Sequence, residues 1–168
     1  MDLSEDAPLP PVTPGDNHLS LMVSPPSSLV ASFDWSRFVR YHLPSYVPFE
    51  VTVQTFDVVI PSTIIVEGAF VSILSSTTWQ YFGSPLLMPV TLNLLAFNRG
   101  TNQLLGILPK LPVTLGGKNI HMDVMVFPGP LDFNLLLGHD YTYAMGVLVS
   151  SLFRVICFPH EGWIVTID

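Results

Sequence analysis

Residues 64–74 read IIVEGAFVSIL, and residues 135–140 read LLLGHD. Each run places a short apolar strand before a glycine, and each is followed by a segment typical of a short helix. Isoleucine and valine favour strands, and glycine permits the sharp turn that must follow them. The same arrangement therefore occurs twice in the chain, and it predicts two buried strands that each end in a tight loop.

Short β-rich runs separated by turn residues fill the rest of the chain beyond residue 49. We expect seven or eight strands, including one strand at 51–60 that stops at Pro61 because proline cannot extend a central ladder. A hairpin is predicted at 90–108, another at 110–127 around Gly116-Gly117, and a last one at 153–167. This spacing indicates an all-β barrel or sandwich.

Two short helices interrupt the predicted strands. The first spans 77–82, with Ser75 or Ser76 as its N-cap and Gly83 as the left-handed residue that ends it. The second spans 139–145 and is closed by Gly146. The helices are too short to form a bundle, so they are expected to support the β-structure.

The first 48 residues differ in composition from the remainder. Eight of the 16 prolines lie in the first 50 residues, but only one of the 11 glycines does. Proline-rich chain favours extended conformations without ladder hydrogen bonds. We expect a largely disordered leader at 1–48, with a short helix around 33–40, followed by one folded domain at 49–168.

The overall composition excludes several classes of function. The 168 residues are 49% hydrophobic and 11% charged, with 13 acidic and six basic residues and a net charge of −7. So few cations argue against nucleic acid as a partner. Polar residues and prolines interrupt the uncharged stretch 70–98, which argues against a membrane span. The acidic N-terminus predicts a protein of the cytoplasm or nucleus that is not secreted.

Four runs of sequence, taken in their order along the chain, carry a family resemblance. They are EGAFVSILS at 67–75, LLAFN at 94–98, LDFNLLLG at 131–138 and VSSLFRVICFPH at 149–160. Together they resemble the retropepsin-like aspartic protease domain in the polyproteins of plant gypsy-type LTR retrotransposons, over about residues 50–168. The resemblance implies a closed β-barrel with a flap hairpin and one or two short helices. It also implies a homodimer that acts on an extended peptide or polyprotein, without a metal or cofactor.

The resemblance assigns roles to particular positions. The hairpin at 92–108 would be the flap that closes over a peptide, and its contacts would come from Phe97, Asn98, Arg99 and Gly100. Leu137 and Gly138 would support the active-site loop from behind. In this family each subunit contributes one aspartate from an Asp-Ser/Thr-Gly-Ala loop, and the two carboxylates share a proton.

The sequence departs from the family at the catalytic position. Aligning Gly68 and Ala69 with the Gly-Ala of the motif places Glu67 at the Ser/Thr position and Val66 at the Asp position. Neighbouring side chains in extended chain point to opposite faces, so Glu67 is not expected to replace the acid. We therefore expect an aspartic endopeptidase domain that is catalytically impaired. The alternative is a non-catalytic β-barrel that dimerises or binds peptides.

Two other groups of residues receive structural interpretations. Cys157 and His160 supply only two ligands, too few for a zinc site, and Cys157 is expected to be a buried apolar residue. Asp140 is expected near the start of the second helix, where a carboxylate complements the helix dipole.

Overall fold

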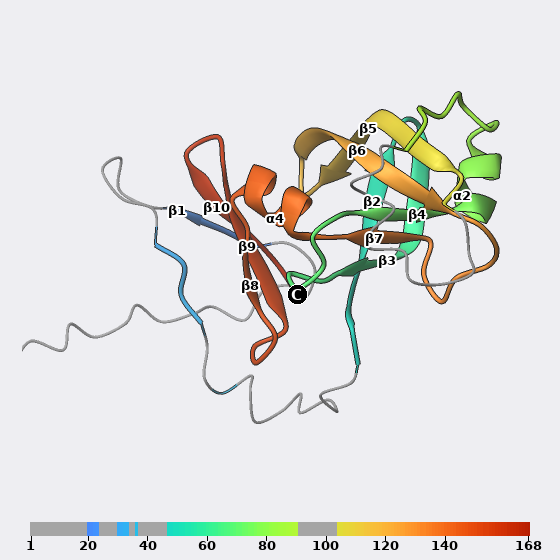
Figure 1. The fold of residues 1–168 in the computed structure, drawn as a ribbon. Coiled ribbons are helices and arrows are strands. Elements are labelled where there is room, and N and C mark those ends of the chain that lie inside the picture. The colour runs from blue at the N-terminus through green and yellow to red at the C-terminus, as the bar shows by residue number, and fades with distance from the viewer. Residues whose placement is uncertain (1–19, 24–29, 34–35, 37–46, 91–103) are drawn as a thin grey trace, which may run out of the picture.

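The computed structural model describes residues 20–23, 30–33, 36, 47–90 and 104–168 (Figure 1). Within these ranges the chain forms, from its N-terminus onward, β1 (Ser20–Val23), β2 (Phe49–Thr55), β3 (Val58–Ile65), β4 (Ile73–Ser75), α2 (Ser76–Tyr81), β5 (Gly106–Leu115), β6 (Lys118–Phe127), β7 (Leu135–Leu137), α4 (His139–Met145), β8 (Leu148–Ser150), β9 (Val155–His160) and β10 (Trp163–Ile167). The predicted mostly-β architecture with two short helices is confirmed.

Six strands form a closed barrel in the order β2-β3-β7-β4-β6-β5. Most neighbours are antiparallel, but β3 pairs with β7 in parallel, and β4 pairs with β6 in parallel. Alternating side chains point inward and form the main core, which includes the fully buried Leu74, Leu111, Val113, Leu135 and Leu137. The barrel thus brings β3 and β7, the two apolar runs of the repeated motif, side by side.

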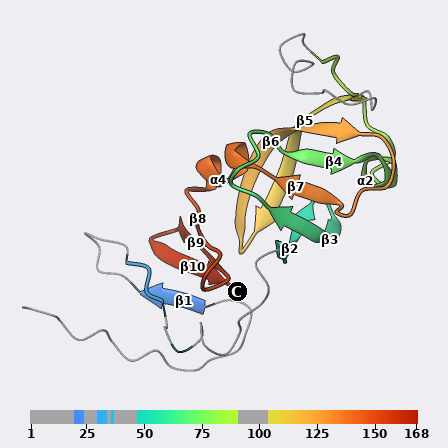
Figure 2. The ribbon, with the colours of Figure 1, turned by 60° about the horizontal axis from the view of Figure 1, so that its bottom comes forward.

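The remaining strands form a second sheet in the order β1-β10-β9-β8. Both views show this sheet set beside the barrel, with α4 between them (Figures 1 and 2). Its β9–β10 hairpin was predicted, whereas β8 and β1 were not. Of the expected leader at 1–48 the structure describes β1, residues 30–33, 36, 47 and 48; the rest lies outside the described residues.

The prediction of a single strand at 51–60 is wrong. The chain turns at Phe56 and Asp57, and β2 and β3 form a hairpin. Pro61 lies inside β3 rather than after it. The register shifts at this point, since Val51 is opposite Thr63 and Val53 is opposite Ile60, so Pro61 falls in a bulge. A bulge leaves residues unpaired, and this accommodates the missing N–H of proline.

The second arm of the hairpin predicted at 90–108 and the first arm of the hairpin predicted at 110–127 lie in one continuous strand, β5. It crosses an irregularity between Leu108 and Leu111, where Lys110 has a positive φ of 53° and its N–H donates to the Asp123 side chain over 2.9 Å. The tip of the predicted flap, Phe97 to Gly100, lies outside the described residues.

The predicted caps are confirmed, and α4 has the predicted bounds, whereas α2 begins and ends one residue before the predicted 77–82. The Ser75 hydroxyl accepts a hydrogen bond from the Thr78 N–H, and Gly83 follows α2 with a φ of 85°. Gly146 ends α4 in the left-handed conformation. Within the described part of the chain, no helix has the length and apolar character needed to cross a membrane.

Candidate functional site

The four residues Val66 to Ala69 form a tight turn directly after β3. The Ala69 N–H donates to the Val66 carbonyl over 3.1 Å, which places Glu67 and Gly68 at the exposed corner. Val66 itself is partly buried, and its N–H donates to the Leu137 carbonyl over 2.9 Å. Val66 thus sits where β3 leaves the barrel, and Glu67 occupies the next position along the turn.

Gly138 supports this turn through close backbone contact. A Cβ at Gly138 would lie 2.6 Å from both the Ala69 and Val71 carbonyl oxygens, so only glycine fits there. The next residue, His139, donates its N–H to the Ala69 carbonyl over 2.6 Å. Leu137 and Gly138 therefore lie against the turn Val66–Ala69 and the residues that follow it.

Ser72 and Asp140 join the loop to α4, and sequence reasoning did not identify this pair. The Ser72 hydroxyl donates to Asp140 Oδ1 over 2.7 Å and accepts the Gly138 N–H over 3.0 Å. The Ser72 N–H donates to Asp140 Oδ2 over 3.2 Å. Ser72 is fully buried. The only signal for this pair in the sequence is a serine inside the apolar run 70–74. That serine does not indicate that its partner is Asp140, 68 residues away.

Asp140 lies in the first turn of α4, as expected for a residue that complements the helix dipole. Its Oδ1 also accepts the Tyr141 N–H over 2.8 Å. The carboxylate thus binds three donors at once, one side chain and two backbone N–H groups. Because these bonds use both oxygens, Asp140 holds the loop in place and is not presented to a substrate.

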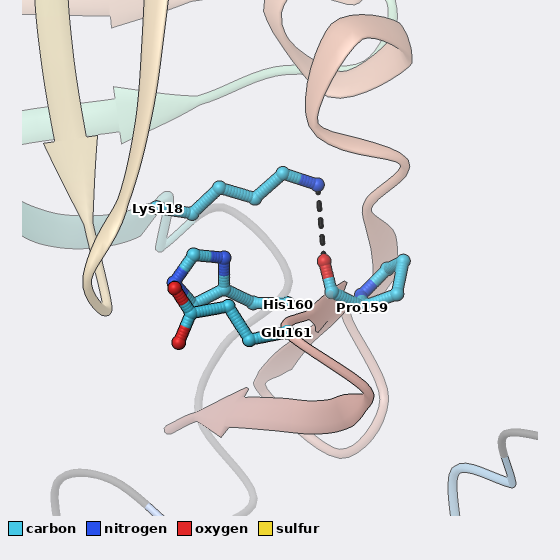
Figure 3. Close-up of polar contacts among 4 residues, drawn as sticks. All are labelled: Lys118, Pro159, His160 and Glu161. Carbon is cyan, nitrogen blue, oxygen red and sulfur yellow. Dashed lines mark hydrogen bonds and ion pairs between the residues drawn. The ribbon is translucent and has the colours of Figure 1, made fainter. Parts of the chain in front are cut away.

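Lys118 fixes the opposite end of α4, because its ammonium donates to the Met145 carbonyl over 2.6 Å. The same ammonium donates to the Pro159 carbonyl over 3.0 Å (Figure 3). It also lies 6.0 Å from the centre of the Phe158 ring. A cation at a helix C-terminus compensates the helix dipole. Lys118 therefore connects the barrel, α4 and the second sheet, while His160 and Glu161 approach each other beneath it at 4.0 Å.

The outer side of the loop is open in a single copy of the chain. A Cβ at Gly68 would meet no atom within 4 Å, and the Phe70 side chain is 76% exposed. One hollow among the described residues lies elsewhere, between β2, the β5–β6 turn and the end of β10. The candidate site is thus a surface loop with a rigid support behind it.

Metal-binding candidates are not found in the described ranges, where no three His, Cys, Asp or Glu side chains form a group. Cys157 is buried, as predicted, and its sulfur lies 3.4 Å from the Thr166 hydroxyl. Burial raises the pKa of the Cys157 thiol, and the Thr166 contact partly opposes this.

Comparison with known proteins gives a match in structure only. No protein-family model matches the chain, and no curated protein sequence matches it. The retroviral protease-like domain of Ddi1 from Leishmania major superposes with a TM-score of 0.58 at 18% identity, over 72% of this chain and 94% of that domain.

Two further solved structures match with lower scores. A retropepsin-like aspartic protease from Rickettsia conorii gives a TM-score of 0.46 at 17% identity, over 70% of this chain and 80% of that one. The EIAV protease, solved with the inhibitor HBY-793, gives 0.44 at 16% identity, over 63% and 93% of the two chains. The closed barrel of this chain and its superposition on the Leishmania domain show that the chain has the retropepsin-like fold.

Proposed function

We propose that the chain is a retropepsin-like aspartic endopeptidase domain of a retrotransposon polyprotein, of the plant gypsy type, whose catalysis is impaired at Val66. The observation that carries this proposal is the turn Val66–Ala69, held by Gly138 from behind in a barrel of retropepsin-like fold. The supporting frame for a catalytic loop is present. The residue at its functional position is apolar.

The chemistry of the family requires an acid at that position. Two carboxylates at close range share one proton, so one accepts a proton from the attacking water while the other protonates the substrate carbonyl oxygen. Valine has no ionisable group and performs neither step. Glu67 is displaced by one residue to the exposed corner of the turn, and catalysis tolerates little misplacement of its groups.

The proposed active form is a homodimer that receives an extended peptide or polyprotein segment, with no metal or cofactor. Each copy contributes one turn at 66–69, so a pair of catalytic carboxylates can form only where the turns of two copies meet. The open space outside Gly68 and the exposed Phe70 support an approach from that side. In this proposal the segment 92–108 closes over the peptide, with Phe97, Asn98, Arg99 and Gly100 as its contacts.

A second candidate function follows from Val66 itself. A partly buried valine at the end of β3 is compatible with a barrel that only dimerises or binds extended peptides. This module needs the fold and the interface but no carboxylate.

Restoring the acid tests the proposal. Cleavage of an unstructured peptide library would be measured at acidic and near-neutral pH, with and without a transition-state-mimic inhibitor of aspartic proteases. We expect no inhibitor-sensitive cleavage by the natural chain and a gain of it in Val66→Asp. The matched control is Val59→Asp, which places the same acid on β3 at a side chain that is 61% exposed, and it should gain nothing.

Sedimentation at micromolar concentration accompanies the assay. Inhibitor-sensitive cleavage by the natural chain contradicts the proposed impairment. A Val66→Asp variant that folds and dimerises but stays inactive contradicts the assignment of Val66 as the cause and favours the non-catalytic module. A chain that remains strictly monomeric contradicts both the proposed homodimeric peptidase domain and the proposed dimerisation module.

A further inference from the structure

The second sheet has two buried faces, covered by different parts of the chain. Ile156, Phe158 and Val165 point toward the barrel and belong to its core. Val155, Cys157 and Ile164 form a separate apolar cluster. Successive side chains in a strand point to opposite faces, so this cluster lies on the outer face of the sheet, away from the barrel.

Residues of the leader cover that outer face. Ala31 and Phe33 pack against the cluster, together with Phe153. The rings of Phe33 and Phe153 are stacked, with centroids 5.0 Å apart and an interplanar angle of 22°. Cys157, a member of the cluster, is only 3% exposed. Without the leader, the cluster would lose its contacts with Ala31 and Phe33.

The leader also occupies the edge of the same sheet. β1 pairs with β10 in antiparallel register from Ser20 opposite Thr166 to Val23 opposite Trp163. β9 pairs with the other side of β10, so β1 takes its outer edge (Figure 2). An uncovered edge presents unpaired N–H and carbonyl groups and accepts strands from other chains.

A third contact anchors the leader where it enters the barrel. The Arg154 guanidinium donates to the Val47 carbonyl over 3.3 Å and to the Pro48 carbonyl over 3.1 Å. It also lies 5.6 Å from the centre of the Phe49 ring. Arg154 precedes β9, so this contact again joins the leader to the second sheet.

We propose that the edge and outer face of the β9–β10 hairpin form a strand-addition site for an extended apolar segment, and that Ser20–Val23 and residues 30–33 of this same chain fill it. The backbone of β10 supplies the ladder, and the cluster Val155, Cys157 and Ile164 receives the apolar side chain that follows. The leader is therefore a strap that covers an interaction surface. This inference is independent of any proteolytic activity.

Cys157 is the natural reporter for the strap, because it is the single cysteine of the chain and belongs to the cluster against which Phe33 packs. In the full chain, the labelling rate of Cys157 by a thiol reagent would be measured at constant pH, well below the thermal transition. The test variants are Phe33→Ala and the pair Leu21→Pro with Met22→Pro. In a strand, alternate N–H groups face the neighbour, so two successive prolines remove at least one ladder bond. We expect labelling to accelerate by roughly tenfold or more through local opening.

Two control variants separate strap opening from other effects. Leu21→Val with Met22→Val retains the N–H groups and strand propensity, and should label at the natural rate. Val53→Ala lowers global stability from the barrel core without touching the strap. If the strap variants label no faster than Val53→Ala at equal thermal stability, the proposal is overturned.

A second measurement tests the site itself. A fluorescent synthetic peptide of residues 18–34 would be titrated into the full chain. We expect saturable binding to the proline pair and little binding to the natural chain, whose own strap competes. A scrambled peptide should not bind. Absence of binding to the proline pair, with its β9–β10 hairpin still protected from hydrogen exchange, would refute a strand-addition site.

Discussion

The two copies of the repeated motif have opposite roles in this molecule. The first, after β3, leads to an exposed turn in which Gly68 has open space beyond it. The second, after β7, leads to Gly138, which is buried against the Ala69 and Val71 carbonyls. Each motif also carries one carboxylate, Glu67 or Asp140. The first carboxylate is exposed, whereas the second binds three donors.

This difference separates residues that hold the fold together from residues that lie at its surface. Gly138, Ser72 and Asp140 are packed or hydrogen-bonded within one copy, so we expect substitutions there to destabilise the fold. Glu67 and Gly68 are exposed, so we expect substitutions there to leave the fold intact. The packed support and the exposed turn are therefore expected to contribute very differently to stability.

The two glycines give the largest contrast. Gly138→Ala forces a methyl group against two carbonyl oxygens and should destabilise the protein by about 3 kcal/mol, the upper range for overpacking. Gly68→Ala should change the unfolding free energy by less than about 0.5 kcal/mol, as at ordinary surface positions. Urea denaturation measures both values. Equal effects at the two positions would contradict the proposed division of roles.

Ser72 joins the two motifs, and its loss should have the second largest effect. Ser72→Ala leaves the buried Gly138 N–H without an acceptor and removes one bond to Asp140, which should cost about 2 kcal/mol. Ser151→Ala, at an exposed turn, is the matched control and should be neutral. Unchanged stability in Ser72→Ala would mean that another group satisfies the Gly138 N–H.

The two carboxylates provide a closer comparison. Asp140→Asn retains one acceptor oxygen but loses the charge that strengthens its bonds, so it should destabilise the protein by roughly 1.5 kcal/mol. Glu67→Gln should have no measurable effect on stability. Hydrogen exchange at the amides of 66–72 should accelerate only in Asp140→Asn. If Glu67→Gln is the more damaging change, Glu67 has a structural role that its exposure does not indicate.

Lys118 should show the smallest of these effects. Lys118→Met removes two bonds to the Met145 and Pro159 carbonyls, which then find other donors in water, for a cost of about 1 kcal/mol. Lys110→Met is the control, because only its backbone N–H bonds to Asp123. Thermal unfolding compares the two variants. A neutral Lys118→Met would show that α4 needs no cation at its C-terminus.

Much of the local structure could be predicted from the sequence, because its causes lie within a few residues. The cap at Ser75 and the left-handed glycines Gly83 and Gly146 depend on neighbouring backbone groups, and the structure confirms them. The strand at 51–60 was mispredicted for the converse reason. Nothing in its β-branched composition marks the turn at Phe56, which only the pairing of β2 with β3 explains.

The sequence alone determined the mostly-β class, the short helices and the repeated strand–glycine motif, since apolar periodicity and turn residues act locally. The family resemblance also predicts that Val66 stands at the position of the catalytic aspartate, and this stays a prediction. Only the tertiary structure decided that Gly138 must be glycine, that Ser72 binds Asp140, and that β1 covers the edge of β10. These depend on contacts between segments up to 146 positions apart, as with Ser20 and Thr166, and such contacts arise only when the barrel closes and the second sheet packs beside it.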